Sequence, residues 1–178
     1  MVRGLLRDRR KQVCVILLVI AVYIMKNIFV GADNDEAYGI VQGYRLAMGD
    51  RLLLEMWEPH QTSAIFTALL IKPFLWLRKG DLDWLTIYLR VVYFIVQFLV
   101  SFSLFRTMRQ ILRDGKKDMA VWMALVFFVS SPKCIYVPEY SNLHIWFATM
   151  LSVSLACFLC SEIRGYGKKG CWFWPEFS

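Results

Sequence analysis

The sequence predicts an all-α, polytopic membrane protein with about four transmembrane helices and two further helices that lie along the outer membrane surface. Hydrophobic residues make up 58% of the 178 residues, and they form long uncharged runs rich in Trp, Tyr and Phe. A soluble domain of this size does not carry such runs. The formal net charge of +7 lies in short clusters between these runs. Charge placed in this way orients a chain in a lipid bilayer, so we expect the bilayer as a partner and no nucleic acid.

The first expected span covers residues 13–30. Five basic residues precede it, so the positive-inside rule places the N-terminus in the cytoplasm and residue 31 outside. A cleaved signal peptide, processed near Val30-Gly31-Ala32, is the alternative. The length of the run and the apolar runs that follow favour a retained anchor. The basic residues are Arg3, Arg7, Arg9, Arg10 and Lys11.

Two helices are expected on the outer surface. In residues 34–48 apolar side chains recur at helical spacing until Gly49, but the segment is too polar to cross the bilayer. Residues 63–77 are apolar, but about 16 helical residues reach only about 24 Å, short of the roughly 30 Å hydrocarbon core. If they crossed, the basic loop 106–118 would fall outside, against the positive-inside rule.

The remaining spans are expected at residues 84–105, 119–137 and 143–161. They place the loop 106–118 in the cytoplasm and the loop 132–144 outside, in a plasma or inner membrane. Residues 1–164 would then form one transmembrane domain, and residues 165–178 a short cytoplasmic tail.

Three acids, Asp33, Asp35 and Glu36, lie where the chain leaves the first span. Asp33 and Glu36 have the spacing of a helix capping box, and acids stabilise a helix N-terminus. That interpretation leaves Asp35 unexplained.

The stretch Asp33-Asn-Asp-Glu-Ala-Tyr38, an amphipathic outer helix and the turn Glu58-Pro59-His60 together resemble the GT-C glycosyltransferases, above all the aminoarabinose transferase of lipid A and the protein O-mannosyltransferases. The resemblance covers residues 13–160. It implies transfer of a sugar from a polyprenyl-phosphate donor to an acceptor hydroxyl on the outer face of the membrane. It also implies that Asp35 is the catalytic aspartate and Glu58 a second catalytic acid. Members of the family have more spans, so we expect the chain to be the N-terminal portion of such an enzyme.

The chain departs from the family pattern at two places. His60 stands where the family often has a second proline. The family's third acid, between the third and fourth spans, has three candidate positions here: Glu139, Asn142 and His144.

The chemistry suits these residues. A sugar phosphate already has a good leaving group, so the reaction needs a base for the acceptor hydroxyl and cations near the developing phosphate charge. Arg90 lies within a span, where it is either functional or paired with an outer acid such as Asp83. Two acids near a phosphate could also hold Mg²⁺. The residues expected to bind substrate are Asp33, Glu36, His60, Arg51 and Lys72, with Lys133 as a further cation.

Two other functions fit the pattern. The outer acids could hold a cation or gather a substrate in a transport protein, although the prolines lie outside the spans or near their ends, whereas transporters often break helices near mid-bilayer. In a non-catalytic structural protein, the acids would only cap a helix.

Overall fold

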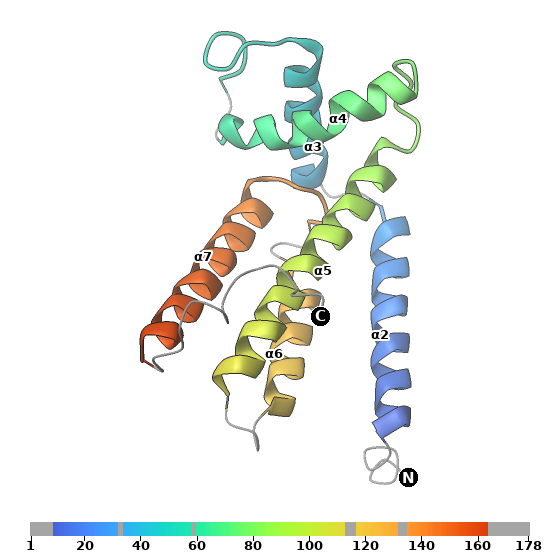
Figure 1. Ribbon diagram of the computed structural model, residues 1–178. Coiled ribbons are helices and arrows are strands. Elements are labelled where there is room, and N and C mark those ends of the chain that lie inside the picture. The colour runs from blue at the N-terminus through green and yellow to red at the C-terminus, as the bar shows by residue number, and fades with distance from the viewer. Residues whose placement is uncertain (1–8, 32–33, 58–59, 113–116, 132–134, 164–178) are drawn as a thin grey trace. The chain divides into compact units, whose positions relative to one another are not determined.

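The computed structural model describes residues 9–31, 34–57, 60–112, 117–131 and 135–163 (Figure 1). Most of these residues are helical, and they contain no β-strand beyond one isolated bridge, so the all-α prediction is confirmed. The elements are α2 (Arg9–Phe29), α3 (Asn34–Met48), the short 3-10 helix η1 (Gln61–Ser63), α4 (Ala64–Leu77), α5 (Leu85–Ile111), α6 (Lys117–Val129) and α7 (Tyr140–Ile163).

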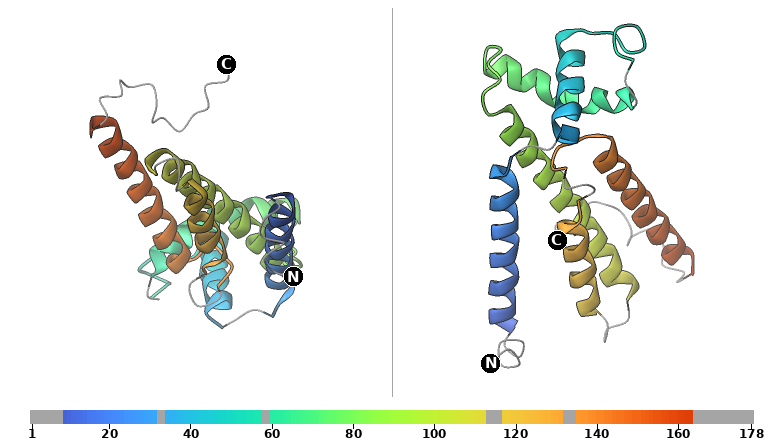
Figure 2. Two further views of the ribbon diagram at one scale, coloured as in Figure 1. Left: turned by 90° about the horizontal axis from the view of Figure 1, so that it is seen from below. Right: turned by 180° about the vertical axis from the view of Figure 1, so that it is seen from behind.

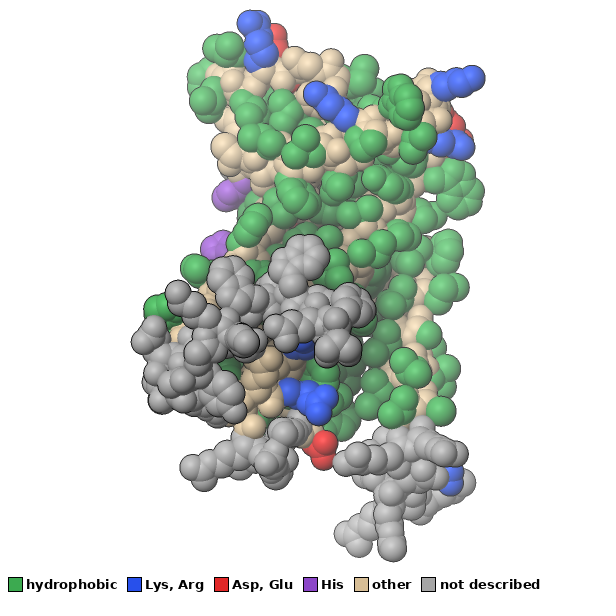
Figure 3. Space-filling model, viewed as in Figure 1, with side chains coloured by type: hydrophobic (Ala, Val, Ile, Leu, Met, Phe, Trp, Pro, Cys, Tyr) green, Lys and Arg blue, Asp and Glu red, His purple; other side chains and the backbone are tan. Residues whose placement is uncertain are grey.

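By length and composition, two helices can each cross a membrane: α5, and α7 over Tyr140–Leu159. A third candidate is α2 continued into α3 as a pair bent by 67°. Apolar side chains such as Leu17, Leu18 and Val22 are exposed on α2, and hydrophobic atoms cover most of that helix in Figure 3. The chain is therefore suited to a membrane.

One expected element ends well before its predicted limit. The span expected over 119–137 is helical only to Val129, because the chain leaves the helix at Ser130 and runs without regular structure from Ile135 to Glu139. At 13 residues, α6 is among the shorter apolar helices. In contrast, α4 continues through Pro73 to Leu77, and α3 has the range that its periodicity predicted.

The chain divides into two compact units. Unit 1 comprises residues 1–95 and 131–142, and unit 2 comprises residues 96–130 and 143–178. In unit 1, α4 crosses α3, as two views show (Figures 1 and 2). The crossing is close because α3 has Gly43 at this position, and small residues let helix backbones approach. A Cβ on Gly43 would lie 2.6 Å from Cγ2 of Thr67 on α4.

The core of unit 1 lies where α4, the start of α5 and the segment 135–139 meet. Thr67 ties two of these parts together, because its hydroxyl donates a 2.5 Å hydrogen bond to the carbonyl oxygen of Pro138. The buried side chains of the core are Ile71, Leu85, Leu89, Ile135 and Val137.

In unit 2, the side chain of Gln97 connects α5 to α6 and α7. Its amide nitrogen donates to the carbonyl oxygens of Phe127 (2.8 Å) and Ser130 (3.2 Å), at the end of α6, and its oxygen accepts a 2.6 Å bond from the indole of Trp146. The side chain thus satisfies carbonyl groups that a helix end leaves without partners.

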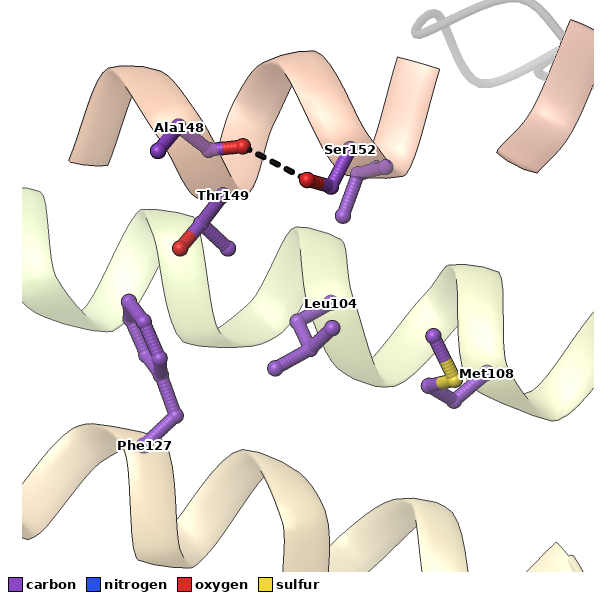
Figure 4. Close-up of a pocket in the computed structure, with 7 residues that line it drawn as sticks. Leu104, Met108, Phe127, Ala148, Thr149 and Ser152 are labelled. Carbon is purple, nitrogen blue, oxygen red and sulfur yellow. Dashed lines mark hydrogen bonds between the residues drawn. The ribbon is translucent and has the colours of Figure 1, made fainter. Parts of the chain in front are cut away.

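An open pocket of about 310 Å³ also lies in unit 2 (Figure 4). Its lining carries no ionisable side chain. The lining residues are Leu104, Met108, Phe127, Ala148, Thr149, Ser152 and Val153.

Candidate functional site

The acidic stretch after α2 contains two neighbouring acids with opposite environments. Glu36 is buried, with 1% of its surface exposed, whereas Asp35 is exposed in the first turn of α3. Both oxygens of Glu36 accept hydrogen bonds from Arg90 of α5, at 2.8 Å from Nε and 2.6 Å from Nη2. Successive residues of a helix point about 100° apart, so one acid can face the protein while the next faces solvent.

This ion pair bears on two predictions from the sequence. Arg90 pairs with an acid of the stretch expected outside, as one alternative held, but that acid is Glu36, 54 residues away, and not Asp83. The carboxylate of Glu36, expected to complete a capping box and to bind substrate, is engaged by Arg90. Asp33, the other half of that capping box, lies outside the described residues.

A second carboxylate lies on the same side of α3 as Asp35. Residues four apart share a helix face, so Gly39 lies one turn beyond Asp35 on that face. A Cβ on Gly39 would lie 3.0 Å from the Cβ of Glu139, which places the Glu139 side chain against this face. Glu139 is 3% exposed, and its Oε1 accepts a 3.0 Å hydrogen bond from the backbone N–H of Ser141, at the start of α7.

The next residue, Tyr140, connects this acid to the loop before α4. Its ring stacks on the imidazole of His60, with 4.0 Å between centroids and 11° between planes. His60 has a left-handed backbone (φ 61°), which is uncommon for a non-glycine residue. We call Asp35, Glu139, Tyr140 and His60 the junction cluster, because Glu139 packs on α3, Asp35 lies in the first turn of α3, and Tyr140 beside Glu139 stacks on His60.

Asn142 and His144, the other two candidates for a third acid, do not share the position of Glu139. The amide nitrogen of Asn142 donates to the carbonyl oxygens of Ile135 (3.1 Å) and Val137 (2.8 Å), so it supports the segment that carries Glu139. His144 is exposed on α7, in unit 2. Of the three, Glu139 is the one that packs on α3.

The expected cations are less closely grouped. Arg51 is exposed and pairs with Glu55 at 3.2 Å, within the loop that follows α3. Lys72 is exposed on α4. Lys and Arg side chains lie on the surface formed by α3, α4 and their loops (Figure 3). Glu58 and Lys133 lie outside the described residues.

Among the described residues, no group of three or more His, Cys, Asp and Glu side chains is arranged to hold a metal ion. The junction cluster therefore presents one exposed carboxylate, one buried carboxylate, an imidazole and a phenol. Of these groups, Asp35 is the acid open to solvent in the first turn of a helix, where a reactant could reach it. Such an arrangement suits proton transfer to or from a bound hydroxyl.

Sequence reasoning left Tyr140 out of this site. The only signal for it was its position next to Glu139, in a loop expected outside. No family model matches the chain, and no curated protein or solved structure matches it either. The function is therefore argued from the junction cluster itself.

Proposed function

We propose that this chain belongs to a membrane glycosyltransferase that moves a sugar from a polyprenyl-phosphate donor to an acceptor hydroxyl on the outer face of the membrane. One observation carries the proposal: in the acidic stretch, Glu36 is engaged by Arg90, while Asp35 is exposed on the helix face against which Glu139 packs. The first acid is buried and binds Arg90, and the second is exposed to solvent.

Asp35 would act as the general base. As the acceptor oxygen attacks the anomeric carbon, the bond from that carbon to the phosphate oxygen breaks. The hydroxyl proton passes to the Asp35 carboxylate, and the polyprenyl phosphate leaves with the bonding electron pair. An acceptor hydroxyl is almost fully protonated at neutral pH, so a positioned base is the help this reaction most needs.

The remaining members of the junction cluster would assist. Glu139 packs on Gly39, which lies one helical turn beyond Asp35, and the imidazole of His60 is stacked on Tyr140, the residue after Glu139. Glu58 is proposed as the second catalytic acid from the family resemblance.

The proposal is tested by Asp35→Asn. Asn keeps the shape of the side chain but cannot accept the proton, so transfer should fall by about 10²–10⁴-fold. Membranes that contain the protein would be given polyprenyl-phosphate sugars labelled in the sugar, and the release of label from the lipid would be measured. Asp118→Asn is the matched control, because Asp118 is likewise exposed in the first turn of a helix, α6.

A non-catalytic structural protein is the second candidate. One observation favours it: Asp35 lies in the first turn of α3, where an acid stabilises the helix dipole. In that case Asp35→Asn and Asp118→Asn should have equally small effects, each below about 1 kcal/mol of stability, because Asn serves a helix N-terminus nearly as well as Asp. Full transfer activity in Asp35→Asn would exclude Asp35 as the base.

A further inference from the structure

We propose that Arg90 is a positioning residue: it holds the end of α2 and the first turn of α3 in one arrangement and so places Asp35 for the reaction. The effect on transfer rests on the proposed function, whereas the holding of the two helices can be measured without it.

All five N–H groups of the Arg90 guanidinium donate hydrogen bonds, and the residue is 2% exposed. Two of them bind Glu36. Two from Nη1 go to the carbonyl oxygens of Ile28 (2.9 Å) and Val30 (2.6 Å), and one from Nη2 goes to that of Gly31 (3.4 Å).

These acceptors lie on both sides of the connection between two helices. The three carbonyl oxygens belong to the C-terminal end of α2 and the residues that follow it, and Glu36 belongs to the first turn of α3. One side chain from α5 therefore joins the end of one helix to the beginning of the next.

The electrostatics of the helix ends favour this arrangement. A helix ends in carbonyl groups without intrahelical partners and carries partial negative charge there, which a cation neutralises. The next helix begins with partial positive charge, which Glu36 neutralises. Lysine could not replace Arg90, because an ammonium group has three donors and no planar fork to bind a carboxylate through two parallel bonds.

Asp35 directly precedes Glu36, so fixing Glu36 also fixes the backbone that carries the proposed base. A displacement of about 1 Å at a reacting group can cost about 10²-fold in rate. A residue that acts only in this way should affect kcat while leaving donor binding, and hence KM, nearly unchanged.

The experiment compares Arg90→Lys with Arg106→Lys, the same change at an exposed position of the same helix. Spin labels on cysteines at Leu18 of α2 and Ala37 of α3, both exposed, would report the distance between the two helices by electron spin resonance. The five native cysteines would first be replaced.

We expect one narrow distance distribution in the parent protein and in Arg106→Lys, and a broadened or shifted one in Arg90→Lys. We also expect kcat per mole of folded protein to fall by about 10–100-fold in Arg90→Lys, with KM within about threefold of the parent. An unchanged distance distribution would overturn the proposal, and so would a parental kcat in Arg90→Lys.

The experiment on Arg90 can be decided independently of whether the proposed function is correct. If Asp35→Asn keeps full activity, the assignment of the base fails, but the distance distribution still decides whether Arg90 holds the two helices. If Arg90→Lys does not accumulate in membranes, Glu36→Gln provides the same measurement, because it keeps the shape of the acid and removes the charge that binds Arg90.

Discussion

Replacing Gly43 with alanine should weaken the packing of α3 on α4, even though alanine is the better helix former. A Cβ at this position would lie 2.6 Å from Cγ2 and 2.7 Å from Cβ of Thr67, and 3.2 Å from Cδ1 of Ile71. The Cβ of Thr67 is fixed to its backbone, and its hydroxyl is held by the carbonyl of Pro138. Rotation of the side chain therefore cannot relieve the overlap, and one helix has to move.

The expected change in stability is the cost of overpacking minus the gain in helix propensity. Overpacking costs about 1–3 kcal/mol, while alanine in place of glycine within a helix returns about 1 kcal/mol. The second term can be measured separately by Ala37→Gly, because Ala37 is exposed on the same helix. The overpacking energy is then the measured loss for Gly43→Ala plus the propensity obtained at residue 37.

Thermal unfolding in detergent, followed by circular dichroism, provides the measurement. In a chain of this size, 1 kcal/mol corresponds to about 2–4 °C in Tm. We expect both substitutions to lower Tm, although one removes a methyl group and the other adds one. If Gly43→Ala raises Tm by as much as Ala37→Gly lowers it, the overpacking energy is zero and the close crossing of α3 and α4 is refuted.

Two further predictions concern the membrane and unit 2. A cysteine at residue 79 should react with an impermeant thiol reagent applied to intact cells, whereas a cysteine at residue 109 should not. This is the pattern that the positive-inside rule requires. The reverse pattern would show that residues 63–77 cross the membrane. Gln97→Leu should destabilise the protein by about 1–3 kcal/mol, because it leaves the buried indole N–H of Trp146 and the carbonyl groups at the end of α6 without this partner. Chemical unfolding followed by circular dichroism would measure the loss, and an unchanged midpoint would contradict the inferred role of Gln97.

Local patterns predicted the helices well, because helix periodicity and stop signals are written into neighbouring residues. The range of α3 follows from its apolar spacing and from Gly49. The end of α6 at Val129 was missed although Ser130, Ser131 and Pro132 follow it directly, and the residue before a proline is disfavoured in a helix. The close approach of α4 to α3 did have a signal, the glycine at position 43, because small residues let helix backbones approach.

The candidate site was predictable in part. The acidic stretch made Asp35 a candidate, but no local pattern predicts which acid pairs with a distant arginine. The pairing of Arg90 with Glu36 depends on the register between α5 and the connection from α2 to α3, which is a property of the packed structure. The placement of Glu139 on Gly39 depends in the same way on the path of residues 135–139.

The pair between Glu36 and Arg90 also bears on why the acidic stretch contains more charges than a helix start requires. Removing two charges from water is costly, and a buried ion pair is often no more stabilising than apolar residues of the same volume. Stability alone is therefore a weak reason for this pair. A pair that fixes one arrangement of two helix ends has a different use, because it holds the neighbouring residue in place. Glu36 is engaged by Arg90 while Asp35, beside it, is exposed, so the same stretch of chain contains both the anchor and the acid that the anchor positions.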